Sequence, residues 1–198
     1  PSVDFCPILY KEKTEPKYDL NNYKHGFNSP SLVDCFVKNG FVIVEEVFDK
    51  NLITYLYNFA TTRYLENKSK FISKFPKKLL PALGISNHIL SQLKSIGLYE
   101  KIKKSDRFLN ALGKILGPDI VIADPSGLWI NDPDDICLAT NKSLHQEIWT
   151  GADTDDLHVW VPLHETEKES TMSVVPESHY FGFLPNQNRN LVCPDGFE

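Results

Sequence analysis

The chain has 198 residues, of which 41% are hydrophobic and 24% charged, an ordinary balance for one folded domain with a substantial core. The aromatic share of 12% excludes a disordered chain. A net charge of −5, with no long run of lysine or arginine, excludes the basic footprint of a nucleic-acid-binding protein. We therefore expect a single domain, residues 1–198, whose partner is a small molecule.

The cysteines, Cys6, Cys35, Cys137 and Cys193, are scattered and form no CxxC pair. This spacing fits neither a zinc ribbon nor the dense disulfide framework of a small secreted domain. No apolar run is long enough to span a bilayer, and the N-terminus lacks the basic and then apolar segments of a signal peptide. We predict reduced thiols in a cytoplasmic protein that does not enter a membrane.

Residues 1–118 are expected to be helical and irregular. "SPSLVDCFVKNG" predicts a short amphipathic helix with a serine cap and a stop at Asn39-Gly40. "FVIVEEVF" predicts a strand, and Asp49 is the expected N-cap of the next helix, "KNLITYLYNFATTRYLEN". Residues 68–117 predict helices and loops, with "SDRFLNALGKILG" as the clearest helix.

Residues 119–198 change in character to short β-prone runs separated by Pro, Gly, Asp and Asn. The runs are "DIVIADPSGLWIND", "ICLAT", "SLHQE", "DLHVWVPL" and "TMSVVP". Short runs with such turns predict the antiparallel strands of a sandwich or barrel. In "DLHVWVPL" the alternation of Leu157, Val159 and Val161 with larger groups predicts one face packed in the core.

The run "SLHQE" contains a histidine and a carboxylate two residues apart. In an extended strand His145 and Glu147 project to the same side, where both can bind one metal ion. A second histidine from another strand would complete the two-histidine, one-carboxylate triad that holds iron(II). His179, in "VVPESH", is the candidate for that ligand. Alternatively, His145 and Glu147 are a paired strand face and His179 is a turn residue.

Several motifs, in the same order, resemble the phytanoyl-CoA dioxygenase-like family of iron(II)- and 2-oxoglutarate-dependent oxygenases. "FVKNGFVIVEEVFDKNLITYLY" resembles the opening of that family, and "FLNALGKILGPDIVI" resembles its helix before the first barrel strand. "LHQE" stands where the family has a metal-binding His-x-Asp, and "VWVPL" resembles its strand before an acidic turn. "SVVPESH" resembles its valine-rich strand that ends in proline, glycine, serine and histidine. The resemblance covers residues 31–192.

The resemblance implies a mainly β fold with flanking helices, a cupin-like double-stranded β-helix (jelly roll) after an N-terminal helical region. It implies that His145, Glu147 and His179 hold Fe(II). Arg189 would pair with the distal carboxylate of the cosubstrate 2-oxoglutarate, since its planar fork suits a carboxylate. The chain departs from the family at Glu147, where aspartate is usual, and at Glu177, where glycine is usual. The interval between Glu147 and His179 is short, so we expect a reduced strand or loop, or further residues beyond Glu198.

The expected activity is hydroxylation of a small metabolite by O₂, with conversion of 2-oxoglutarate to succinate and CO₂. The resemblance implies that Trp160 packs near the cosubstrate, and plain packing in the core is an equal alternative. Ile148 and Trp149, with the first ninety residues, would shape the substrate pocket. His158 and His164, which flank Trp160, are the replacement ligands if the strand register differs.

Two other functions stay open. One is a non-catalytic jelly-roll domain that binds a carbohydrate or another small ligand. The other is a metal-dependent glycosyltransferase in which Asp153 and Asp155 hold Mg²⁺ or Mn²⁺. The sequence before these aspartates lacks the βαβ pattern that should bind the nucleotide, so we interpret "ADTDD" as a solvated turn. Neither the substrate nor the oligomeric state can be deduced from the sequence.

Overall fold

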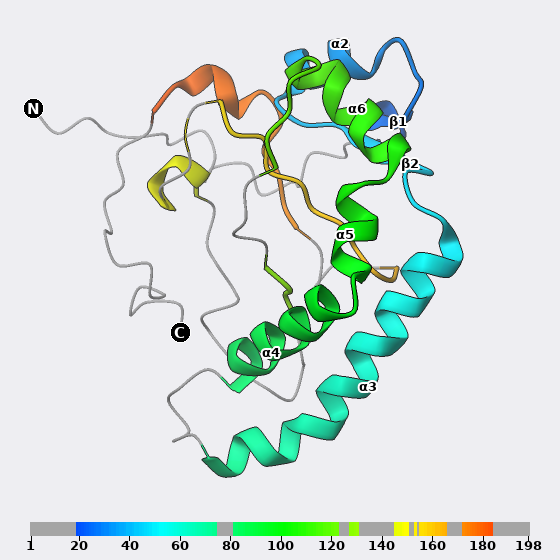
Figure 1. Cartoon of the computed structure of the whole chain (residues 1–198). Helices are drawn as coiled ribbons and strands as arrows, with labels where there is room; N and C mark the ends of the chain where they lie inside the picture. The colour runs from blue at the N-terminus through cyan, green and yellow to red at the C-terminus, as the bar shows by residue number, and fades with distance from the viewer. Residues whose placement is uncertain are drawn as a thin grey trace, which may run out of the picture.

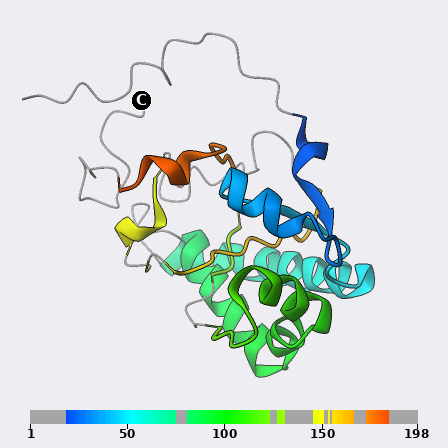
Figure 2. The same ribbon diagram turned by 90° about the horizontal axis from the view of Figure 1, so that it is seen from above.

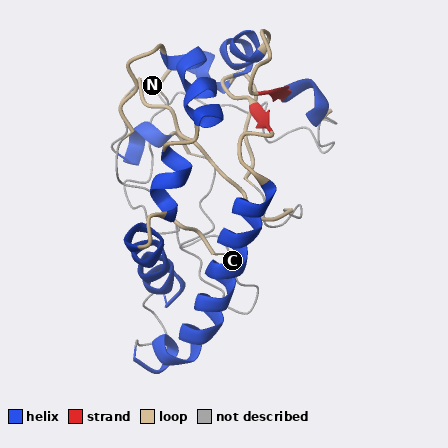
Figure 3. Ribbon diagram, turned by 45° about the vertical axis from the view of Figure 1, so that its right-hand side comes forward, coloured by secondary structure: helices blue, strands red, loops and turns tan. Residues whose placement is uncertain are grey.

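The computed structural model describes residues 19–74, 81–122, 127–130, 145–150, 153, 155–165 and 172–183. Helices dominate these residues, and the strands are two short pieces (Figure 3). The elements in chain order are η1 (Leu20–Tyr23), β1 (Lys24–Gly26), α2 (Leu32–Asn39), β2 (Ile43–Glu45), α3 (Lys50–Lys74), α4 (Pro81–Ser95), α5 (Leu98–Lys103), α6 (Asp106–Leu116), η2 (Glu147–Thr150) and η4 (Ser178–Phe181). Among the helices described, none is both long and apolar enough to cross a bilayer.

The strands β1 and β2 pair in parallel, with His25 opposite Val44, and α2 crosses between them. The predicted bounds of α2 are confirmed, because the helix ends at Asn39 and Gly40 follows in the left-handed conformation (φ 79°). The serine cap is not formed as expected. Ser31 makes no capping bond, and its hydroxyl instead lies 3.1 Å from Nδ1 of His25.

The hydrophobic core lies between α3 and α4, which run side by side at the lower edge of the molecule (Figure 1). Both helices place a buried residue at every fourth position, the spacing that keeps side chains on one face. The core residues are Leu56, Ala60, Tyr64, Ile85, Ile89, Leu93 and, from α5, Leu98. The predicted N-cap of α3 is confirmed, since Oδ1 of Asp49 accepts the backbone N–H of Asn51 at 2.8 Å and of Leu52 at 3.3 Å.

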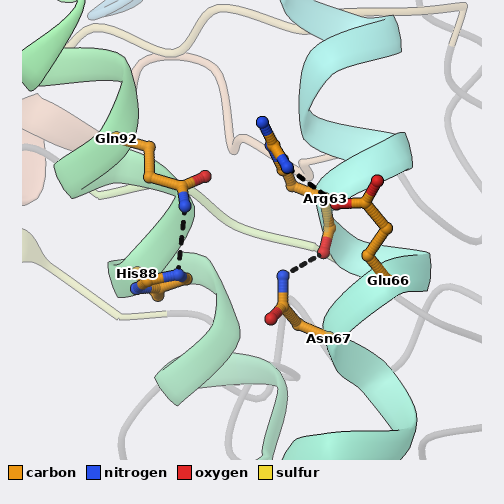
Figure 4. A network of polar contacts seen from close by, with 5 residues as sticks. All are labelled: Arg63, Glu66, Asn67, His88 and Gln92. Atoms are coloured by element: carbon orange, nitrogen blue, oxygen red, sulfur yellow. Dashed lines mark hydrogen bonds and ion pairs between the residues drawn. The ribbon is translucent and has the colours of Figure 1, made fainter.

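Polar side chains accompany this core on the facing sides of α3 and α4 (Figure 4). On α3, Arg63 pairs with Glu66 at 2.8 Å, and the side chain of Asn67 donates to the carbonyl of Arg63 at 2.7 Å. On α4, the Gln92 amide lies 3.1 Å from Nε2 of His88. Each of these contacts joins two residues of the same helix. They stabilise each helix, and the apolar core lies between α3 and α4.

Helix α6 fastens the β1–α2–β2 unit to the rest of the molecule. It packs on α2, and its Lys114 ammonium donates to the carbonyl of Phe27 at 2.9 Å. The Arg107 guanidinium donates to the carbonyl of Glu46 at 3.1 Å and lies over the ring of Phe27. The two basic side chains thus hold the loops that follow β1 and β2.

The expected mainly β jelly roll is wrong for the residues described. The runs at 119–122, 127–130, 156–163 and 172–175 form no strands there, and "ICLAT" lies outside the described residues. The physical reason is that a β-prone run favours an extended backbone, whereas a strand also needs a hydrogen-bonding neighbour. Three side chains of these runs pack on the α3–α4 core instead of on a second sheet: Leu128, Ile130 and Leu163.

Candidate functional site

The candidate site begins with His145 and Glu147, whose side chains meet as expected. Nε2 of His145 lies 3.1 Å from Oε1 of Glu147. The local backbone is not the predicted strand, because Glu147 opens the short helix η2. The contact is formed nonetheless, between His145, which precedes η2, and the first residue of that helix. We call these two residues the histidine–glutamate pair.

A second imidazole lies on the other side of the same carboxylate. Nδ1 of His158 is 4.0 Å from Oε2 of Glu147, which is beyond hydrogen-bond length but within reach of an ion pair. His158 comes from the extended segment 155–165 and is exposed. The structure therefore sets an imidazole beside each oxygen of Glu147. The sequence pointed to His158 only as a replacement ligand, because nothing local ties it to a residue eleven positions earlier.

His179, the expected third ligand, is directed elsewhere. Its Nε2 lies 2.9 Å from the carbonyl of Val37 in α2. Its ring also lies against the ring of Tyr180, with 4.0 Å between the centroids and a tilt of 36° between the planes. The expected grouping of His145, Glu147 and His179 around one ion is therefore not present. Within the described part of the chain, no three His, Cys, Asp or Glu side chains are grouped in a way that could hold a metal ion, so the metal-binding prediction lacks a site there.

The structure describes some of the residues predicted to surround the metal and leaves others outside its described part. Trp160 lies in the extended segment and is about half exposed (49%). Ile148 is half-buried in η2, and Trp149 belongs to the same turn, with its side chain outside what the structure describes. Arg189, the predicted partner of 2-oxoglutarate, lies outside the described residues.

The aspartates proposed for a glycosyltransferase form a local turn. The backbone N–H of Asp153 donates to Oδ2 of Asp156 at 2.8 Å, and the N–H of Asp156 returns to the carbonyl of Asp153 at 3.3 Å. These two bonds close a local turn between Asp153 and Asp156. Asp153 and Asp155 are both exposed. This geometry agrees with a solvated turn and gives no support to a nucleotide-sugar site.

A shallow hollow of about 280 Å³ lies elsewhere, along α3. Its lining residues all come from that helix: Tyr55, Asn58, Phe59, Thr62, Arg63 and Glu66. The rings of Tyr55 and Phe59 stack on each other, and Arg63 lies over Phe59 while it pairs with Glu66. Tyr55, Phe59, Arg63 and Glu66 thus contact one another, which makes the hollow a weaker candidate than the histidine–glutamate pair.

The pair can do two kinds of chemistry. A carboxylate beside an imidazole fixes the ring and its tautomer, which is how a histidine is prepared for proton transfer or for metal binding. An exposed carboxylate with two neighbouring imidazoles also carries the donor types that divalent transition metals prefer.

The chain matches no protein-family model, no curated protein and no solved structure. The resemblance to the phytanoyl-CoA dioxygenase-like family thus stays a prediction that rests on its motifs alone. The function has to be argued from the side chains of the site.

Proposed function

We propose that the chain is an iron(II)- and 2-oxoglutarate-dependent oxygenase of cytoplasmic location, acting on a small metabolite. The observation that carries the proposal is the contact of 3.1 Å between His145 and Glu147, at the position where the ordered motifs require the first two ligands. His158, 4.0 Å from the second carboxylate oxygen, adds a further imidazole to this region. O₂ would be the oxidant: one of its oxygen atoms would enter the substrate, and the other would enter succinate as 2-oxoglutarate loses CO₂, with iron(II) as the metal that holds the cosubstrate.

The described arrangement does not by itself fit an iron centre, because the ring of His179 contacts α2. We therefore derive no catalytic step through the metal. The roles that the described side chains support are limited to two residues. Glu147 orients the imidazole of His145 and supplies negative charge for a cation, while the half-buried Ile148 provides an apolar wall beside it.

The test is an anaerobic titration of the whole protein with Fe(II) and 2-oxoglutarate. Binding of both should produce a weak visible charge-transfer band, and turnover should release succinate. His145→Ala and Glu147→Gln should each abolish the band. His164→Ala is the matched control, because this histidine packs on Tyr57 of α3 and should leave the band intact. A folded wild-type protein that gives no band at any Fe(II) concentration would rule the proposal out.

A second candidate is a non-catalytic domain that binds a small ligand. The observation that favours it is the direction of His179, which leaves the pair without the expected third ligand. This candidate predicts a folded protein without Fe(II)-dependent absorption or succinate formation. The same titration therefore separates the two functions.

A further inference from the structure

A turn near residue 180 is docked on the C-terminal end of α2. The backbone N–H of Glu177 donates to the carbonyl of Asn39 at 2.8 Å. Nε2 of His179 and the hydroxyl of Tyr180 both donate to the carbonyl of Val37, at 2.9 and 3.1 Å. The last four backbone carbonyl groups of a helix accept no hydrogen bond from within the helix. Residues more than 130 positions away along the chain therefore cap α2, and Figures 1 and 2 both place this turn beside the helix.

Gly40 forms the socket for this docking. A Cβ on Gly40 would lie 2.5 Å from Nδ1 and 3.0 Å from Cγ of His179, so the imidazole occupies the space that any other residue would fill. Gly40 also has φ of 79°, a conformation that side chains with a Cβ disfavour. Glycine is needed here for two independent reasons, and only one of them involves His179.

One ring nitrogen of the docked imidazole is bound to the backbone of α2, and the other lies beside Gly40. Nε2 is engaged with the carbonyl of Val37, and Nδ1 faces the backbone of Gly40. A metal-binding histidine has to offer the lone pair of one ring nitrogen. In this arrangement His179 has a role other than that of a ligand.

The docked turn is also joined to the histidine–glutamate pair. The side-chain amide of Gln146, the residue between His145 and Glu147, donates to the carbonyl of Gly182 at 2.8 Å. Gly182 directly follows η4, which contains His179. A continuous path of contacts therefore runs from α2 through the turn to the candidate site.

We propose that His179 is a positioning residue: its ring sits in the Gly40 socket and, through Gly182 and Gln146, sets the place of the histidine–glutamate pair relative to α2. The role of the positioned pair in binding Fe(II) rests on the proposed function, whereas the docking of His179 does not. Glu177 shows how strongly the turn is constrained, since it has φ of 64°, in the region that favours glycine.

The docking is tested by a double-mutant cycle between Gly40→Ala and His179→Ala, with Gly97→Ala as the matched control. Gly97 has a similar φ of 74°, but a Cβ there meets nothing within 4 Å. Gly97→Ala should lower the folding equilibrium constant roughly 5- to 30-fold from backbone strain alone. Gly40→Ala should lower it at least tenfold more. In the His179→Ala background the two alanine variants should cost the same, because the ring that clashes is gone. Purely additive effects of Gly40→Ala and His179→Ala would overturn the docking.

The positioning of the histidine–glutamate pair can be measured in the metal-free protein by NMR, from the imidazole ¹⁵N chemical shifts of His145. These signals should shift in His179→Ala, Gly40→Ala and Gln146→Ala, and should stay unchanged in Gly97→Ala. Unchanged signals in all four variants would overturn the proposal even if the docking itself were real. This result is independent of whether the protein binds Fe(II).

The Fe(II) titration then separates positioning from ligation. His179→Ala should weaken the affinity for Fe(II) by about tenfold or less. His179→Gln keeps a donor for the Val37 carbonyl, so it should restore most of that affinity. If His179 is instead a ligand, His179→Gln should lose binding as completely as His145→Ala does, and the inference is then wrong while the proposed function stands. If the wild-type protein binds no Fe(II), the proposed function fails, and the cycle and the ¹⁵N signals still decide the inference.

Discussion

Two parts of the described chain, the mainly helical residues 31–74 and 81–117 and the later residues between 119 and 183, differ in how they bury side chains. Among the described residues, every buried side chain lies between Tyr23 and Leu112. The later region contributes partly buried side chains to the α3–α4 core and leaves several large apolar groups exposed: Val121, Trp129, Val159, Trp160, Met172, Val174, Tyr180, Phe181 and Phe183. The helices thus close a core among near neighbours in sequence, whereas the later region is attached to a core that already exists.

Loss of a core side chain should have the largest effect on stability. Leu56→Ala removes a residue that is 1% exposed and should cost about 2–5 kcal/mol, because the packed helices cannot fill the space. Val159→Ala, at a residue that is 48% exposed, should cost about 0.5 kcal/mol or less. Urea unfolding of both variants measures the contrast. Equal costs would show that the extended region has a core of its own.

Leu163→Ala should have an intermediate effect. Leu163 is half-buried and packs on the α3–α4 core, so its loss should cost about 1–2 kcal/mol. Unfolding should remain a single transition if the extended region depends on the helices. Two separate transitions in fluorescence and circular dichroism would contradict that dependence.

Asp49→Ala should cost about 1 kcal/mol, because it removes the acceptor of two backbone N–H groups at the start of α3. Asp49→Asn retains an acceptor and should restore most of the loss. Thermal unfolding of the two variants checks this. No difference between them would mean that the cap contributes little in this chain.

The smallest effect should come from Lys103→Ala. The hydrogen bond from Lys103 lowers the pKa of Glu100; burial opposes this, and the charges of Lys103 and Lys104 add to the lowering. Because the pKa of Glu100 is lower in the folded than in the unfolded protein, the ionised carboxylate stabilises the fold at pH values above the unfolded-state pKa. This stabilisation is lost as the pH falls through the folded-state pKa. Lys103→Ala should raise the pKa of Glu100 and flatten this acid dependence, as a carboxyl ¹³C titration can measure. Lys101→Ala should leave that pKa unchanged.

The helices could be predicted from the sequence because their signals are local. The Asn39-Gly40 stop and the Asp49 cap act within one turn of the residues that they affect, and both are confirmed. The strands predicted from residue 119 onward are absent from the described residues, because strand pairing depends on partners that the sequence does not specify locally. The apolar residues that predicted a second sheet, such as Leu163, pack on helices instead.

The candidate site also combines contacts that are local in sequence with contacts that are distant in sequence. The contact between His145 and Glu147 is present, but the strand alternation that predicted it is not, since Glu147 opens η2. The direction of His179 depends on Val37, 142 residues earlier, and no spacing rule connects them. The glycine at position 40 was visible only as a helix stop, because its second role appears when the ring of His179 lies against it.

The capping of α2 by a distant turn also bears on the order of folding. Helix α2 has only eight residues, too few for stability alone, and two of its terminal carbonyls receive their partners from residues 177–180. A ribosome makes α2 long before that turn, and closing so long a loop costs entropy. The end of α2 therefore becomes fixed late in folding, and the candidate site is positioned in that same step.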